Sequence, residues 1–264
     1  DRIEALLEDG KYRKAERNAK RLAKKATKKL GDSHVYRPFL AKVLAEHALH
    51  MGEWHEYETH VGDMISHSGD ILGDTSQAYA YYLLEASRIW EEAGYKQKAF
   101  DYLQEAKQLY GENTEDEVQV DIIRLETKLL VEMGHYVDAQ QLVRDSYEFM
   151  HAYGSNKQGN KKEQRQRYQQ FAGFVVTASQ AALDRGNIDQ ADSLLRQHEK
   201  EFKKKLGKYA WERVAYTKLR ARIYEHTNNP KEAKRLYQEA YALSIKKRRI
   251  EDKRITPYRK AEIE

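Results

Sequence analysis

A six-residue turn pattern recurs along the chain and constrains the fold more than any other feature of the sequence. It begins with glycine, usually has an aromatic or apolar residue near the third position, and in most copies ends with alanine. The copies start at Gly10, Gly52, Gly94, Gly134, Gly186 and, as Asn-Asn-Pro, at Asn228, so they are 42, 42, 40, 52 and 42 residues apart. A nearly fixed period of this length predicts stacked structural repeats.

Each turn separates two stretches with helical periodicity. Before Gly94, the segment 76–93 places apolar residues on one helical face, and the segment after the turn does the same. The apolar positions are Tyr79, Leu83, Ala86, Trp90, Ala99, Leu103, Ala106 and Leu109. Glycine suits the turn because it readily adopts the left-handed conformation that often ends a helix. We therefore expect each repeat to be an antiparallel pair of helices.

Small residues occupy two fixed positions around each turn. Seven residues before it stand Ala45, Ser87, Thr127, Ser179 and Ala221, and five residues after it stand Ala15, Ala99, Ala139, Ala191 and Ala233. Small side chains let paired helices approach closely while larger neighbours fill the grooves. Tyr57 replaces the alanine in the second repeat, which predicts that this pair is splayed or repacked.

The second helix of each pair is expected to end at another glycine, namely Gly31, Gly73, Gly111, Gly154 or Gly207. The segment 154–167 is basic and longer than its equivalents, and we interpret it as a loop or an extended helix end. Residues 246–264 form a basic C-terminal extension. We expect residues 1–264 to form a single repeat domain. Because the chain begins at Asp1 without methionine and its first helix is short, we also expect this domain to be part of a larger protein.

Composition agrees with long, solvated helices. Charged residues make up 34% of the chain and there are only three prolines, and few helix breakers favour helices. The absence of cysteine excludes disulfides and thiolate ligands. The net charge of +5 is unevenly placed, because ten Lys or Arg residues lie between Lys11 and Lys29 against one acid, Glu16. Such runs are typical of solvated helix faces or of surfaces that bind nucleic acid.

The pattern of small residues, turns and apolar positions resembles the tetratricopeptide (TPR) repeat. The turns, and the apolar residue four positions after the turn alanine (Leu103, Val143, Leu195, Tyr237), carry this resemblance over most of the chain. A period near 42 is similar to the longer repeat of kinesin light chains. The resemblance implies an all-α solenoid of about six antiparallel helix pairs in a right-handed superhelix. It also implies protein binding rather than one particular partner.

In such solenoids the first helix of each pair lines the concave face, where the family holds its ligands. Counting back from each turn gives the expected partner-binding residues: Phe39, Lys42, Tyr81, Leu84, Arg88, Arg124, Lys128, Gln180, Lys218 and Arg222. Arginine binds carboxylates through a planar fork, and tyrosine offers stiff amphipathic contact area. We therefore expect an acidic, partly apolar segment of another protein as the partner.

No sequence motif indicates catalysis. The chain has no glycine-rich phosphate loop, no His-Glu-x-x-His and no Gly-x-Ser-x-Gly, which are the signatures of several enzyme classes. Histidines gather in the second repeat (His47, His50, His55, His60 and His67), but their spacing matches no established zinc motif. We therefore expect no enzyme activity, no cofactor and no metal.

The leading functional hypothesis is a protein-interaction scaffold that holds a peptide or helix of a partner. A second hypothesis is a sensor or regulatory module within a larger signalling protein. A third, of a different class, is nucleic-acid binding through the basic N-terminal helix and the basic tail. Steep salt dependence of binding to generic RNA or DNA would distinguish the third from the first.

Overall fold

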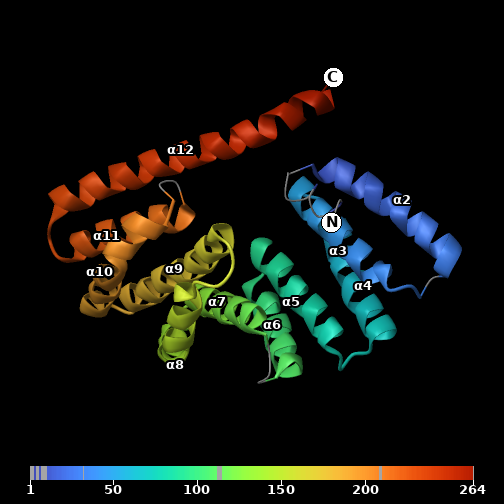
Figure 1. Cartoon of the computed structure of the whole chain (residues 1–264), viewed down its shortest axis with the longest axis horizontal. Helices are drawn as coiled ribbons and strands as arrows, with labels where there is room; N and C mark the ends of the chain where they lie inside the picture. Colours follow the sequence, from blue (N-terminus) through green and yellow to red (C-terminus); the bar gives the residue numbers. More distant parts are fainter. Residues whose placement is uncertain are drawn as a thin grey trace. The chain divides into compact units, whose positions relative to one another are not determined.

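The computed structural model describes residues 3, 6, 11–31, 33–111, 115–207 and 210–263, and this part of the chain contains eleven α-helices and no strand (Figure 1). None of these helices is both long enough and apolar enough to cross a membrane. The expectation of an all-α fold is confirmed.

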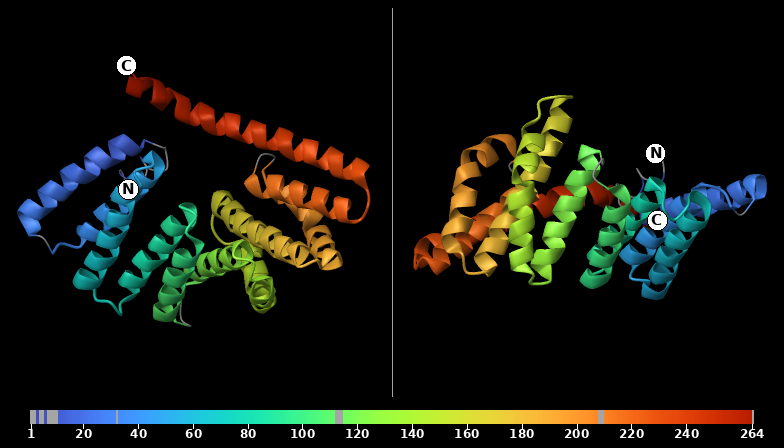
Figure 2. Two further views of the ribbon diagram at one scale, coloured as in Figure 1. Left: turned by 180° about the vertical axis from the view of Figure 1, so that it is seen from behind. Right: turned by 90° about the horizontal axis from the view of Figure 1, so that it is seen from below.

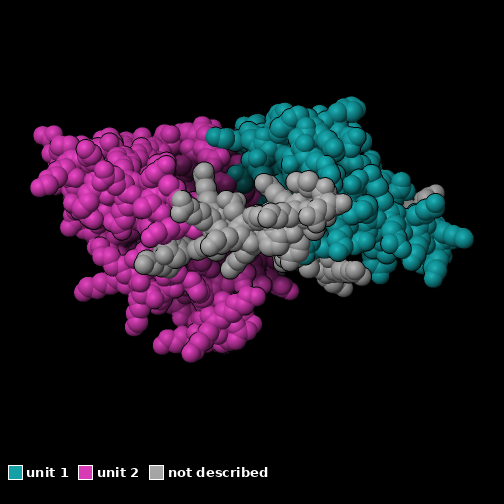
Figure 3. Space-filling view, turned by 90° about the horizontal axis from the view of Figure 1, so that it is seen from above, with its two compact units in different colours: residues 1–114, 254–264 teal, residues 115–253 magenta. Residues whose placement is uncertain are grey.

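The chain forms two compact units, residues 1–114 with 254–264 and residues 115–253, where the repeat pattern predicted a single domain (Figure 3). The helices of unit 1 are α2 (Tyr12–Leu30), α3 (Tyr36–Met51), α4 (Trp54–Leu72), α5 (Gln77–Glu92) and α6 (Lys96–Tyr110). Those of unit 2 are α7 (Asp116–Glu132), α8 (Tyr136–Ser155), α9 (Lys161–Asp184), α10 (Ile188–Lys205), α11 (Trp211–His226) and the first part of α12 (Pro230–Ile263).

The helices of each unit are arranged as pairs that pack on their neighbours (Figure 2). In unit 1, α3 pairs with α4 and α5 with α6, and the two first helices α3 and α5 also touch. In unit 2, the first helices α7, α9 and α11 contact one another in succession. The first helices therefore form a continuous layer within each unit, as the TPR resemblance implies.

The turns have the predicted backbone conformation. Gly52, Gly94, Gly134 and Gly186 have φ between 75° and 87°, and Asn228 has φ of 55°. This left-handed region is open to glycine and tolerated by asparagine. Gly10 lies outside the described residues. The pattern of turns between paired helices is confirmed at these five positions.

The small residues on either side of the turns lie in the interior of the protein. All ten positions predicted to be small and close-packed are buried. In one pair, the Ser87 hydroxyl donates a hydrogen bond of 2.7 Å to the backbone carbonyl of Ala99 on the facing helix. Tyr57 is also fully buried, and its ring packs edge-on against Trp90 with 4.9 Å between ring centroids. The second repeat is thus repacked around an aromatic pair.

The irregular segment is shorter than the sequence indicated, because residues 154–155 end α8 and residues 161–167 already belong to α9. The Asn160 side chain accepts hydrogen bonds from the backbone N–H groups of Lys162 and Glu163, and the Glu163 carboxylate accepts one from the Asn160 N–H. This capping box starts α9, and only residues 156–160 form the loop. Gly154 does not end a helix in the left-handed conformation but lies within α8, against Phe171.

The core of unit 2 contains a histidine among aromatic rings. His198 is only 3% exposed, and its Nε2 is hydrogen-bonded to the Tyr147 hydroxyl at 2.8 Å. Its ring lies 5.1 Å from that of Phe171 and 6.2 Å from that of His151. Burial lowers the pKa of His198, and the nearby His151 and Lys205 act in the same direction, whereas Glu201 acts against them.

We expect this histidine to make the stability of unit 2 depend on pH. A histidine with a lowered pKa in the folded state stabilises the protein above its unfolded pKa of about 6.5, and that contribution is lost as the pH falls below this value. His198→Gln should flatten the fall in unfolding free energy between about pH 6.5 and 5, measured by urea denaturation. An unchanged slope in His198→Gln would contradict the assignment.

Candidate interaction surface

A groove of about 530 Å³ lies along the layer of first helices in unit 2. Three helices supply its lining at the helical spacing of three or four residues. They contribute Lys128, Val131 and Glu132 from α7, Val176, Thr177 and Gln180 from α9, and Ala215, Lys218, Leu219 and Arg222 from α11. A face shared by three packed helices is a stiff platform, because each helix is held by its neighbours.

The floor of the groove is apolar and its rim is polar. Val131 and Leu219 are buried, and Val176 is half-buried, whereas Lys128 and Lys218 are exposed. At one edge, Asp184 of α9 joins two rim residues. It accepts hydrogen bonds of 2.8 Å from Arg222 Nη2 and 2.5 Å from Gln180 Nε2. Asp184 therefore fixes this edge of the groove.

The structure brings together four of the residues expected at the interaction surface: Lys128, Gln180, Lys218 and Arg222. Arg124 lies one turn earlier on α7 and does not line the groove. Its guanidinium is 3.6 Å from the carboxylate of Asp121, and a Cβ added to Gly173 of α9 would lie 3.7 Å from it. Arg124 is thus close to the groove but directed over the neighbouring helix.

The expected residues of unit 1 lie on α3 and α5, where two of them pair with the same acid, Glu85. Lys42 Nζ lies 2.7 Å from Glu85 Oε2 and 3.4 Å from the Tyr81 hydroxyl. Arg88 pairs with the same Glu85. Burial alone would lower the pKa of Lys42, but the charges of Glu85, Tyr81 and Glu46 and the hydrogen bond with Glu85 together raise it. Phe39 is half-buried. Tyr81 is the most exposed residue of this set, with 40% of its surface accessible.

Leu84 does not belong to the surface, and its assignment from the sequence was wrong. Its side chain is 3% exposed and packs in the core of unit 1. Counting back from the turn identified the helix on which Leu84 lies. It did not give the rotation of that helix about its axis, which decides the residues that face the surface. A residue three positions after the exposed Tyr81 can face either the surface or the neighbouring helix, depending on how α3 and α5 cross.

Sequence reasoning missed six groove residues: Val131, Glu132, Val176, Thr177, Ala215 and Leu219. A signal for them was present, because each stands three or four positions from a residue that was identified. Positions so spaced share one face of a helix. No group of three or more potential metal ligands occurs among the residues that the structure describes.

Comparison with known proteins identifies the fold. No protein-family model matches the sequence, and no curated protein matches it. Among solved structures, a kinesin light chain-like protein of Podosopora anserina with nearly identical TPR-like repeats is 17% identical, with a TM-score of 0.62, over 82% of this chain and 99% of that one. That match is a single-substitution variant. A second structure described in the same terms is also 17% identical, with a TM-score of 0.59, over 78% of this chain and 94% of that one.

The helix pairs, the turns and these structural matches define an α-solenoid of the TPR-like class. The fold is similar to that of kinesin light chain-like repeats, which the long period of the sequence also resembles.

Proposed function

We propose that the groove of unit 2 binds a segment of a partner protein and that the chain serves as a non-catalytic interaction scaffold. The main support is that Lys128, Gln180, Lys218 and Arg222, from three different repeats, line one groove. Residues so far apart in sequence meet there only because the first helices stack. A TPR-like fold can present this binding face without any catalytic residues.

The groove favours an acidic, amphipathic segment. Its lining contains three cations, Lys128, Lys218 and Arg222, and one acid, Glu132, above an apolar floor. Carboxylates of a partner would pair with the lysines at the rim, while leucine-like side chains of a helix would contact Val131, Val176 and Leu219. The volume suits one or two such side chains rather than a whole domain.

Selection from a displayed peptide library against the whole chain would test this function. We expect the selected peptides to be rich in acidic and aliphatic residues. The double variant Lys128→Glu, Lys218→Glu should bind them at least about tenfold more weakly, because two attractive charges become repulsive. The matched control is Lys200→Glu, Lys204→Glu, which makes the same charge change at exposed positions of α10.

Equal loss of affinity in both double variants would show that net charge, rather than the groove, governs binding. Failure to select any peptide would count against a peptide-binding groove altogether.

One observation favours a second function, which is binding to nucleic acid. On α2, nine basic side chains are exposed: Arg13, Lys14, Arg17, Lys20, Arg21, Lys24, Lys25, Lys28 and Lys29. The side chains of the basic tail beyond Lys247 lie outside the described residues. If the chain retained generic RNA at about 100 mM salt, with affinity falling steeply as salt increased, this second function would gain support.

A further inference from the structure

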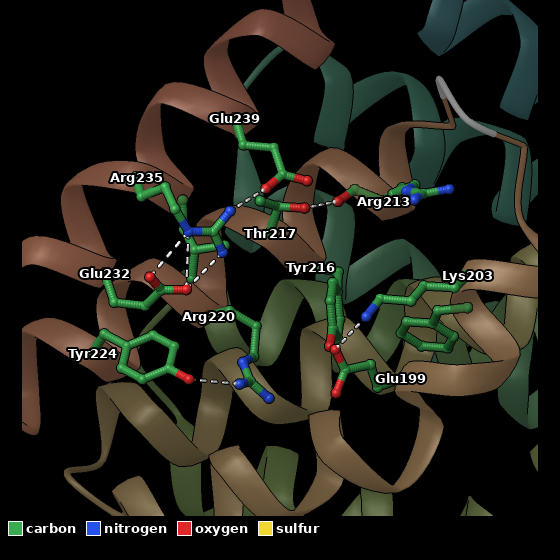
Figure 4. Close-up of a pocket in the computed structure, with 12 residues that line it drawn as sticks. Glu199, Lys203, Arg213, Tyr216, Thr217, Arg220, Tyr224, Glu232, Arg235 and Glu239 are labelled. Atoms are coloured by element: carbon green, nitrogen blue, oxygen red, sulfur yellow. Dashed lines mark hydrogen bonds and ion pairs between the residues drawn. The ribbon is translucent and has the colours of Figure 1, made fainter. Parts of the chain in front are cut away.

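A second pocket of unit 2, of about 330 Å³, lies between α10, α11 and α12 (Figure 4). Its lining is predominantly charged and aromatic. The residues are Glu199, Phe202, Lys203, Arg213, Tyr216, Thr217, Arg220, Tyr224, Glu232, Arg235, Leu236 and Glu239. None of them was among the residues expected from the sequence to bind a partner.

This pocket and the groove lie on opposite faces of α11. The pocket takes positions 213, 216, 217, 220 and 224 of the helix, and the groove takes positions 215, 218, 219 and 222. At about 100° per residue, the two sets are centred half a turn apart. A ligand in one site therefore does not compete for side chains with a ligand in the other.

Most charges in the pocket are neutralised within it. Lys203 pairs with Glu199 at 2.8 Å, and Arg235 pairs with Glu232 at 2.6 Å and Glu239 at 3.2 Å, as Figure 4 shows. These pairs account for all three acids of the lining. The other two cations of the lining are Arg213 and Arg220, and Arg220 lies 3.6 Å from Asp192, an acid of α10 outside the lining.

Arg220 is held in place but not fully hydrogen-bonded. It is 9% exposed, and its Nη2 donates to the Tyr224 hydroxyl at 3.2 Å. Its Nη1 is 3.6 Å from Asp192 Oδ1, which is close enough for an ion pair but too far for a hydrogen bond. Arg220 Nη1 and Asp192 Oδ1 are both buried without a hydrogen-bond partner in the described part of the chain. A guanidinium can only donate, so Nη1 needs an acceptor.

Tyr216 supplies a second buried group of this kind, one turn before Arg220. The residue is 8% exposed, and its hydroxyl has no hydrogen-bond partner among the described residues. Burial raises the pKa of Tyr216 to about 12, against the opposing charge of Arg220. The hydroxyl therefore keeps its proton at neutral pH and is available as a donor. Buried polar groups in native proteins rarely lack partners unless a ligand or water supplies one.

We propose that this pocket binds the oxyanion group, a phosphate or a carboxylate, of a small molecule. Arg220 Nη1 and the Tyr216 hydroxyl donate to its oxygens, and the guanidinium of Arg213 adds positive charge at the pocket wall. Charge-assisted hydrogen bonds from arginine suit both oxyanions. Phe202 and Leu236 are available to an apolar part of the ligand. A volume of 330 Å³ lies at the lower end of the range for small-molecule sites, which favours a metabolite-sized ligand over a peptide.

Two probes test this site on the whole chain: inorganic phosphate and, separately, succinate, each titrated at ionic strength held constant with sodium chloride. Binding is followed by NMR of arginine side chains and by calorimetry. We expect saturation by at least one probe below about 10 mM. Tyr216→Phe keeps the ring and removes only the hydroxyl, so it should weaken binding about tenfold without unfolding the chain. Arg220→Gln should weaken it further.

Lys204→Gln is the matched control, because it removes one positive charge from an exposed position of α10 that does not line the pocket. Saturation by phosphate alone assigns a phosphate group to the ligand, saturation by succinate alone assigns a carboxylate, and either result supports the site. The proposal is overturned if neither probe saturates, if Tyr216→Phe binds as well as the unaltered chain, or if Lys204→Gln loses as much affinity as Arg220→Gln.

Discussion

Replacing Phe171 with alanine should lower the free energy of unfolding of unit 2 by about 3–5 kcal/mol, the largest effect expected from a single change in this chain. Phe171 is fully buried in α9. Its ring lies 5.4 Å from that of His151, 5.1 Å from that of His198 and 6.3 Å from that of Tyr147. These residues come from α8 and α10, so the ring joins three helices. Its removal leaves a cavity that the stiff helices can only partly close.

Native-state hydrogen exchange of amides in α8, α9 and α10 measures this loss without requiring the whole chain to unfold in one step. Tyr241→Ala is the control, since Tyr241 is 69% exposed on α12 and its removal should change stability by less than about 0.5 kcal/mol. If Phe171→Ala lowered stability by no more than this control, the packing of the three helices around the ring would have to be different.

The second large effect is expected at Gly154, where alanine should lower the free energy of unfolding by about 1–3 kcal/mol. A Cβ added there would lie 2.5 Å from Phe171 Cβ and 2.9 Å from its Cγ. Both atoms sit at the base of the Phe171 side chain, so a rotamer change cannot move Cβ away. The added methyl therefore forces α8 and α9 apart. Urea denaturation followed by near-UV circular dichroism would report the change.

Gly62→Ala is the matched control with the opposite expected sign. Gly62 is an exposed glycine inside α4, and a Cβ added there meets nothing within 4 Å. Because alanine is the better helix former, this variant should be more stable by about 0.5–1 kcal/mol. If both glycine variants gained stability, the close approach of α8 and α9 at Gly154 would be refuted.

Much of the fold could be predicted from the sequence, because the determining signals are local. The turn positions depend on a few consecutive residues, and Gly52, Gly94 and Gly186 have the expected left-handed conformation. The small residues on either side of each turn were also identified correctly, since their spacing follows helical geometry. The start of α9 had a local signal as well, in the pair Asn160 and Glu163, but a run of polar residues concealed it.

The candidate surface could be predicted only in part. Four of the expected residues line the groove, whereas Leu84 is buried and Arg124 points over the neighbouring helix. Sequence periodicity gives the helix on which a residue lies but not the crossing angle that decides its exposure. The network of Lys42 and Glu85 joins residues 43 positions apart, and nothing near either residue indicates the other.

By itself, the sequence determined the helix pairs, their turns and their repeat period, because each depends on residues close together along the chain. Only the tertiary structure decided which side chains meet. It placed Arg222 against Asp184, 38 residues earlier, and it buried Arg220 Nη1 and the Tyr216 hydroxyl without a hydrogen-bond partner among the described residues. Such contacts depend on the stacking of helices from different repeats, and the free energy of that stacking comes from the shape of the whole core rather than from any local motif.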